Sequence, residues 1–319
     1  MNLNEIRHAK IRISDFLKPT SLARCQVLER DLAFPGKIYL KFENEQPTGS
    51  FKVRAAFNLI SQLSSEKKDQ GVITNSTGNF ALAVAYAAHF FLVRATLILP
   101  TDTPRSKIDK IMKFNPLISF SKEADSEALM GSLIQKNGYT PLHPYNDYQT
   151  ISGFGTLALE VLEQLPNVHH FFGPIGGGGL LSGCALALKE TLPTIKIYGI
   201  EPAGAGDYFA SRMAGKKVSL NFVDTIADGL RYPCVGELNY PLLNQFVDHV
   251  HLVSDIEIKQ ALAWLWKKLK VKAEPAGVVS LAGFINNHKN INGNTVILIT
   301  GKNVEEEKFK EWSSSSFYP

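Results

Sequence analysis

The order of strand-like and helix-like segments along the chain constrains its fold more than any other feature of the sequence. Short apolar runs, such as residues 95–99 and 295–300, are separated by longer amphipathic or alanine-rich stretches, such as residues 80–90. Strands separated by helices are typical of parallel sheets with helices on both faces. One series ends near His143 and a second begins near Thr156. We therefore predict an α/β fold with two lobes, each built on a mostly parallel sheet.

The expected elements follow from these periodicities and from the turn residues between them. Strands are expected at residues 38–43, 72–74, 95–99, 117–120, 139–143, 169–174, 196–200 and 295–300. Helices are expected at residues 51–63, 80–90, 104–114, 123–136, 156–165 and 180–192, and a last one ends at Lys270. Ser254 and Glu257 have the spacing of a capping box, which favours the start of that last helix here.

The length, charge and cysteine content of the chain exclude several classes of protein. Its 319 residues suffice for about two domains, and a hydrophobic fraction of 45% is too high for a disordered chain. The 34 basic and 30 acidic residues leave a net charge of +4, which is too small and too spread out to indicate nucleic-acid binding. The three cysteines are far apart and odd in number, so we expect no disulfide framework and a reducing compartment.

The N-terminal residues and the most apolar stretch both bear on the location of the protein. Residues 1–10 are polar and lack the apolar region of a signal peptide. Residues 80–100 are the most membrane-like stretch, but they include His89 and Arg94 and are better explained by a packed helix followed by a buried strand. We expect a cytoplasmic protein without a membrane segment.

Four consecutive glycines, Gly176, Gly177, Gly178 and Gly179, stand between an apolar strand and an apolar helix. They let the backbone approach a ligand closely and turn its N–H groups toward an anion, which the helix dipole also attracts. A flexible turn is the alternative, but ordering four glycines costs entropy and nothing structural demands them there. The spacing fits neither the dinucleotide-binding fingerprint nor the P-loop. We therefore predict a phosphate site.

Two further loops follow strands, at the sheet edge where α/β proteins bind ligands. Residues 76–79 (Ser-Thr-Gly-Asn) offer two hydroxyls, an amide and a helix N-terminus, which suit an anion. Taken alone, they are more simply interpreted as an N-cap followed by a glycine turn. Residues 300–303 (Thr-Gly-Lys-Asn) follow the last strong strand and carry little information by themselves.

A lysine follows a turn at the start of an apolar helix. Lys52 comes directly after residues 47–51, at the N-terminal end of the expected helix. A cation there opposes the helix dipole, so the position suits an amine that is partly neutral or covalently used. A surface lysine with a buried stem is the ordinary alternative. A phosphate site, a lysine amine for a Schiff base and a hydroxyl-bearing strand end are together what pyridoxal 5'-phosphate requires.

With these segments in place, the sequence resembles the pyridoxal-phosphate enzymes of the tryptophan-synthase β-subunit fold (fold type II), in the branch of serine/threonine dehydratases and serine racemase. The resemblance covers roughly residues 10–305 and keeps the family order of motifs. The matching segments are residues 41–43 (Lys-Phe-Glu), 48–54 (Thr-Gly-Ser-Phe-Lys-Val-Arg), 76–79, 143–144 (His-Pro), 155–156 (Gly-Thr), 176–179, 225–229 (Thr-Ile-Ala-Asp-Gly) and 274–277 (Glu-Pro-Ala-Gly).

The resemblance implies how the cofactor is held. Lys52 would form the Schiff base and Phe51 would flank the cofactor. Asn79 would bond to the hydroxyl of the pyridine ring, and Thr300 would face the ring nitrogen. The four glycines at residues 176–179 would hold the phosphate.

The domain division and the partners are implied in the same way. Residues 1–45 and 149–319 would form a large cofactor-binding domain, and residues 46–148 a small mobile α/β domain. The implied partners are a small amino-acid substrate and a second copy of the chain in a homodimer. The racemase branch also binds a divalent cation, here Mg²⁺ or Ca²⁺, through a pattern that appears as Glu201, the carbonyl of Ala205 and Asp207. All three are oxygen ligands suited to such a cation.

The reaction implied by the resemblance is β-elimination of water from a β-hydroxy amino acid, such as L-serine or L-threonine, to a 2-keto acid and ammonia. Ser76, Thr77 and Asn79 would bind the substrate carboxylate. The Lys52 amine, with a pKa lowered by burial, would remove the Cα proton, and the cofactor phosphate would protonate the leaving hydroxyl. The neutral hydroxyl of Thr300 cannot stabilise a protonated ring nitrogen, which favours prompt elimination.

Other functions remain open at this point. In serine racemase a serine hydroxyl acts as the second acid/base at the position of Thr77, so the chain could be a racemase with side dehydratase activity. The substrate could also be 3-hydroxyaspartate. Three residues depart from the family pattern: Phe80 replaces a histidine, Phe154 a glutamine and Lys302 a glycine. A cofactor-binding protein with weak or lost catalysis is therefore a further alternative.

Overall fold

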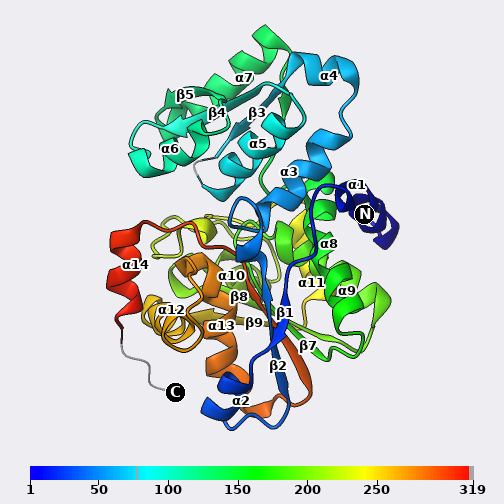
Figure 1. The fold of residues 1–319 in the computed structure, drawn as a ribbon, viewed down its shortest axis with the longest axis vertical. Helices are drawn as coiled ribbons and strands as arrows, with labels where there is room; N and C mark the ends of the chain where they lie inside the picture. Colours follow the sequence, from blue (N-terminus) through cyan, green and yellow to red (C-terminus); the bar gives the residue numbers. More distant parts are fainter. Residues whose placement is uncertain (77, 316–319) are drawn as a thin grey trace.

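The computed structural model describes residues 1–76 and 78–315, and this part of the chain forms two sheets flanked by helices (Figure 1). The strands are β1 Leu22–Arg24, β2 Lys37–Phe42, β3 Val72–Asn75, β4 Ala95–Pro100, β5 Leu117–Ser121, β6 Thr140–Pro141, β7 His170–Pro174, β8 Lys196–Pro202, β9 His249–Val253 and β10 Asn294–Ile299. In the described residues, the six-stranded sheet has the order β1-β2-β10-β7-β8-β9 and the four-stranded sheet the order β5-β4-β3-β6.

Helices cover both sheets. The α-helices are α1 Leu3–Ser14, α2 Gln26–Asp31, α3 Lys52–Ser61, α4 Ser65–Gln70, α5 Asn79–Phe90, α6 Arg105–Met112, α7 Ser126–Asn137, α8 Tyr148–Gln164, α9 Gly179–Thr191, α10 Asp207–Ala214, α11 Asn239–Phe246, α12 Asp255–Leu269, α13 Pro275–Asn287 and α14 Glu306–Ser313. Short 3₁₀ turns include η1 Glu43–Glu45, η3 Ala203–Ala205 and η4 Asp228–Leu230. In Figure 1 the four-stranded sheet with α4 to α7 lies at the top, and α3 lies between the two sheets.

Strand β10 lies in the middle of the six-stranded sheet, and its pairing and burial show how this sheet is built. It pairs in parallel with β2 on one side and with β7 on the other, and every one of its residues is buried. Helix α13 packs on β7, β8 and β10, while α9 packs against β7; Figure 1 shows α12 and α13 on one side of the sheet and α8 and α9 on the other. Parallel strands covered on both faces are expected to be continuously apolar, and the predicted fold class is confirmed.

Helix α8 is longer than the expected helix at residues 156–165. It begins at Tyr148, where the Asp147 side chain accepts a hydrogen bond from the Thr150 backbone N–H. Gly153 lies inside the helix and marks close packing. A β-carbon added at Gly153 would lie 2.7 Å from Ala55 Cα in α3, so only glycine lets the two helices approach this closely.

Other expected boundaries differ for local reasons. The strand expected at residues 139–143 shrinks to the two residues of β6, since a proline such as Pro141 cannot donate to the ladder. Helix α1 was not expected, although Ile6, Ala9 and Ile13 are buried at helical spacing and Asn2 with Glu5 forms a capping box. The capping box predicted at Ser254 is present.

The apolar stretch at residues 80–100 forms α5 and β4, as expected from its polar interruptions. Among the described residues, no helix combines the length and the apolar character needed to cross a bilayer.

Candidate active site

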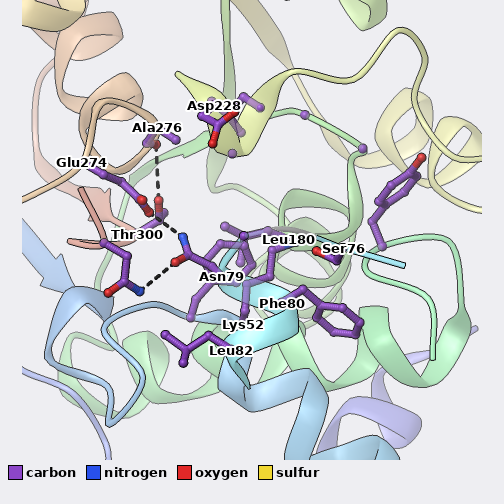
Figure 2. Close-up of a pocket in the computed structure, with 18 of the residues that line it drawn as sticks. Lys52, Ser76, Asn79, Phe80, Leu82, Leu180, Asp228, Glu274, Ala276 and Thr300 are labelled. Carbon is purple, nitrogen blue, oxygen red and sulfur yellow. Dashed lines mark hydrogen bonds between the residues drawn. The ribbon is translucent and has the colours of Figure 1, made fainter. Parts of the chain in front are cut away.

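One pocket of about 150 Å³ lies where the ends of the two sheets face each other (Figure 2). The residues singled out from the sequence that line it are Phe51, Lys52, Ser76, Asn79, Gly176, Gly177, Gly178, Gly179 and Thr300. It is also lined by Tyr145, Tyr232, Lys107, Lys110, Asp228, Glu274 and Asn303. Thr77, which was predicted to contact the substrate, lies outside the described residues. The fold thus brings together loops that are more than two hundred residues apart in the sequence.

Lys52 occupies the first position of α3, with its amine directed into the pocket. Its Nζ donates to the carbonyl of Pro144 at 3.1 Å and lies 5.0 Å and 5.1 Å from the ring centroids of Phe51 and Phe154. Burial lowers the pKa of Lys52 to about 7, and the nearby carboxyl of Glu274 only partly opposes this. The amine is therefore available in its neutral form near neutral pH.

A buried ion cluster anchors the helix that carries Lys52. The Arg54 guanidinium donates to both carboxylate oxygens of Glu43 at 2.7 Å and to those of Glu160 at 2.6 Å and 2.8 Å. Lys41 donates to Glu160 at 2.8 Å. Burial alone would lower the pKa of Arg54, but the two carboxylates raise it above its usual value. These contacts fix α3 against η1 and α8. They therefore also position Lys52, which precedes Arg54 by two residues.

The glycine loop (residues 176–179) joins β7 to the N-terminus of α9. A β-carbon at Gly177 would lie 2.3 Å from Cγ of Tyr145, and one at Gly179 would lie 2.9 Å from the Tyr145 carbonyl oxygen. Gly178 has a φ of +90°, which other residues rarely adopt. Side chains would fill this space, whereas the glycine backbone leaves N–H groups of a helix N-terminus exposed to a ligand. The loop fits an anionic group such as a phosphate.

The side chain of Asn79 is held on both sides. Its Nδ2 donates to Oε1 of Glu274 at 2.6 Å, and its Oδ1 accepts from Nδ2 of Asn303 at 2.7 Å (Figure 2). One N–H of the amide remains for a ligand. Burial raises the pKa of Glu274 to about 7, although the hydrogen bond from Asn79 lowers it. The pocket therefore holds a carboxyl group that takes up and releases a proton near neutral pH.

Thr300 directly follows the strand β10 and lines the pocket. Its hydroxyl donates to the carbonyl of Ala276 at 3.3 Å, and its own carbonyl accepts from the Phe51 backbone N–H at 3.2 Å. The neighbouring Lys302 is exposed and does not line the pocket. The departure from the family pattern at Lys302 therefore lies at the surface rather than in the pocket wall.

The predicted cation ligands lie together outside this pocket. Glu201 accepts from the backbone N–H groups of Tyr208 at 3.0 Å and Phe209 at 2.6 Å. Asp207 accepts from Val235 N at 2.6 Å with one oxygen, and its other, buried oxygen has no hydrogen-bond partner among the described residues. Burial raises the pKa of Asp207 to about 7 and that of Glu201 well above its usual value, and the negative charge of Asp207 raises the latter further.

This donor set fits a hard divalent cation. Ala205, whose carbonyl is the third expected ligand, is buried in η3 and lies between the two carboxylates in the sequence. Within residues 1–76 and 78–315, no cluster of three or more histidine, cysteine, aspartate or glutamate side chains has metal-binding geometry. Any cation here would therefore rest on two carboxylates and backbone oxygens rather than on a larger set of side chains.

Sequence reasoning missed Glu274 and Asn303 as pocket residues. Both stand in segments that were noted, at residues 274–277 and 300–303, but neither segment alone indicates that it meets Asn79. Tyr145 and Tyr232, whose rings pack edge to face at 4.8 Å, carried no signal at all in the sequence.

Comparison with known proteins agrees with this geometry. The sequence pattern of the family described as pyridoxal-phosphate dependent enzyme matches residues 13–301. The chain is 36% identical to the L-threonine ammonia-lyase of Thermotoga maritima over 307 residues, which are 96% of this chain and 76% of that protein. It is 36% identical to the serine racemase of Arabidopsis thaliana over 309 residues, 94% of this chain and 92% of that protein. The structure of maize serine racemase matches with a TM-score of 0.92 and 34% identity, over 97% of this chain and 96% of that one.

Proposed function

Because the chain belongs to the pyridoxal-phosphate dependent enzymes, we propose that it removes water from a β-hydroxy amino acid, such as L-serine or L-threonine, and yields a 2-keto acid and ammonia. The observation that carries the proposal is the position of the Lys52 amine, which lines the same pocket as the glycine loop and the loop at residues 76–79. An amine beside two anion-binding loops fits a phosphorylated aldehyde together with a carboxylate-bearing substrate.

We assign the cofactor positions on this basis. Lys52 would form the covalent bond to the cofactor aldehyde, and the glycine loop would hold the phosphate. The free N–H of Asn79 would bond to the ring hydroxyl, Phe51 would flank the ring and Thr300 would face its nitrogen. When bound, pyridoxal phosphate withdraws electrons from the substrate and makes its Cα proton acidic.

The chain itself supplies the base. Lys52 has a pKa of about 7, and a base works best when its pKa is near the operating pH. Three aromatic rings surround the amine, and the Pro144 carbonyl, which accepts its hydrogen bond, orients it. We propose that the neutral Lys52 amine removes the Cα proton of the bound substrate.

The substrate carboxylate is assigned to Ser76, Thr77 and Asn79. Ser76 and Asn79 line the pocket, and Asn79 begins the twelve-residue helix α5, whose N-terminal N–H groups attract an anion. Held at the carboxylate and at the amine, the substrate has a fixed orientation of its Cα–H bond, which is what an efficient proton transfer needs.

Racemisation is the second candidate, supported by the similarity to a plant serine racemase. It requires an acid/base on the face of Cα opposite Lys52, a role for the Thr77 hydroxyl. Replacing Thr77 with alanine is expected to abolish D-serine formation while keto-acid release continues. Equal loss of both activities would speak against separate roles for the two faces.

We propose that Glu201, the Ala205 carbonyl and Asp207 bind Mg²⁺ or Ca²⁺. The support is the partnerless oxygen of Asp207 and the proximity of two buried carboxyls whose pKa values are raised. A divalent cation would remove the cost of burying both negative charges.

The decisive experiment is a substrate panel with the reconstituted protein. The wild type is expected to release keto acid from L-serine or L-threonine, and Lys52→Ala to release none, whereas the exposed Lys113→Ala serves as a matched control with wild-type activity. A protein that takes up the cofactor but yields keto acid from neither serine, threonine nor 3-hydroxyaspartate would overturn the proposal in favour of a cofactor-binding protein without catalysis.

The proposal extends to the setting of the enzyme. We propose a small domain at residues 46–148 that moves against residues 1–45 and 149–319, a homodimer, and a cytoplasmic location. The three free thiols, Cys25, Cys184 and Cys234, support a reducing compartment. Light scattering tests the dimer, and limited proteolysis with and without substrate tests the domain movement.

A further inference from the structure

Three aromatic rings surround the Lys52 amine. Its Nζ lies 5.0 Å from the ring centroid of Phe51, 5.1 Å from that of Phe154 and 5.9 Å from that of Phe80. Phe51 and Phe154 pack edge to face with centroids 4.8 Å apart. Phe80 and Phe154 are also the two positions at which the sequence departs from the polar residues of the family it resembles.

Phe80 and Phe154, the two phenylalanines that replace polar residues of the family, differ in their contacts with the pocket. Phe80 lines the pocket, whereas Phe154 does not and packs edge to face against Phe51. Phe80 follows the loop at residues 76–79 directly in the sequence and lines the same pocket as Lys52 and Ser76, and Figure 2 labels all three residues there. Any group bound between the amine and that loop therefore borders the Phe80 ring.

The position of the substrate follows from the proposed function, on which this inference rests. A base that takes the Cα proton lies within about 3 Å of it, and Nζ lies 5.9 Å from the Phe80 centroid, so a substrate held between Nζ and the loop at residues 76–79 borders the Phe80 ring. Leu82, Ile111 and Leu180 line the same pocket. A polar or charged substituent on Cβ gains no hydrogen bond from such a wall and loses its water, whereas a methyl group is buried there.

We propose that Phe80 is a specificity-determining residue that selects substrates with an apolar substituent on Cβ, so that threonine-like amino acids are preferred over serine. One methyl group in an apolar pocket changes kcat/KM by roughly 10-fold or more. The wild type is therefore expected to favour L-threonine over L-serine by about 10-fold in kcat/KM.

Two substitutions at this position test the proposal. Phe80→His keeps a ring of similar size but adds polar atoms, and it is expected to lower the threonine-to-serine ratio about 10-fold, chiefly through threonine. Phe80→Leu keeps an apolar wall and is expected to retain most of the preference. The matched control is Phe154→Gln, which alters a ring at a similar distance from Nζ but outside the pocket wall. It is expected to leave the ratio unchanged, whatever it does to the rates.

A binding measurement provides a readout without turnover. L-2-aminobutyrate and L-alanine differ by one methyl group and lack the hydroxyl that leaves, so calorimetry of the loaded enzyme reports the methyl contact alone. Wild type is expected to bind aminobutyrate several-fold more tightly than alanine, and Phe80→His is expected to abolish the difference. Equal affinities in the wild type would overturn the inference.

The possible outcomes distinguish a failure of the specificity role of Phe80 from a failure of the proposed function. Release of keto acid from none of the substrates would remove the proposed function. Release from serine and threonine at a ratio that Phe80→His does not change would leave that function intact and overturn the role of Phe80. Faster turnover of 3-hydroxyaspartate than of threonine would also overturn it and would direct attention to Lys110, a pocket lysine with no hydrogen-bond or ion-pair partner in the described residues.

Discussion

The Glu274 carboxyl accepts a 2.6 Å hydrogen bond from the amide of Asn79, although the two residues are 195 positions apart in the chain. Asn303 donates to the same amide from its other side. Two loops from the C-terminal part of the chain thus orient the first residue of α5. The arrangement also places a buried acid near the buried amine of Lys52, and each has a pKa of about 7.

Glu274 makes the stability of the cofactor-free protein depend on pH. Burial raises its pKa from 4.5 to about 7, so between these values the folded state binds more protons than the unfolded state. Stability from this group is complete below about pH 4.5 and is lost as the pH rises to about 7. We expect Glu274→Gln to gain about 2 to 3 kcal/mol relative to the wild type across this window.

Urea denaturation at about pH 5 and about pH 7.5 measures this difference. The exposed carboxyl Glu311 provides the control, since Glu311→Gln should change stability little at either pH. A constant difference between Glu274→Gln and the wild type at both pH values would contradict the prediction.

Arg54 is expected to be essential for stability, because its removal would leave Glu43 and Glu160 buried with only part of their partners. Arg54→Met should cost about 3 to 5 kcal/mol in the free energy of unfolding. Arg105→Met breaks an ion pair with Asp109 whose side chains are both mostly exposed, and it should cost less than about 1 kcal/mol. Chemical denaturation of both variants provides the comparison; similar costs would show that burial of the cluster matters little.

The glycine loop should tolerate no side chain. Gly177→Ala places a methyl group where Tyr145 now lies, so we expect the loop to shift and the affinity for pyridoxal phosphate to fall at least about 10-fold. Gly131 in α7 has open space around it, and Gly131→Ala should leave cofactor affinity unchanged while stabilising the helix by about 0.5 to 1 kcal/mol. Absorbance titration with the cofactor tests both variants.

A divalent cation should stabilise the protein through Asp207 and Glu201, and more strongly at high pH than at low pH. The pKa of both carboxyls is raised, so the cation must displace protons below about pH 7. At a free concentration 100 times its dissociation constant, Mg²⁺ or Ca²⁺ adds about 2.7 kcal/mol. Thermal unfolding with the cation or with EDTA measures this. Asp207→Asn should remove the effect, and the exposed Asp69→Asn should preserve it.

The features that were predictable from sequence are those that a short segment determines alone. The glycine loop and Lys52 were recognisable because four glycines and a lysine at a helix start need no distant partner to be noticed. The contacts of Asn79 with Glu274 and Asn303 could not be predicted, because the local sequence around each residue does not indicate which distant loops meet in the folded protein. Helix α8 begins earlier than expected, and Gly153 within it makes a close contact with Ala55 that only the folded structure reveals.

The place of β10 between β2 and β7 has a consequence for biosynthesis. A chain emerging from the ribosome exposes β2 some 250 residues before its partner, since the register joins Lys37 to Asn294 and Phe42 to Ile299. All strands of the four-stranded sheet lie between Val72 and Pro141, so they are synthesised within a short stretch of the chain. Folding during translation should therefore complete the smaller sheet first, while the larger sheet stays open at its centre until β10 has been synthesised.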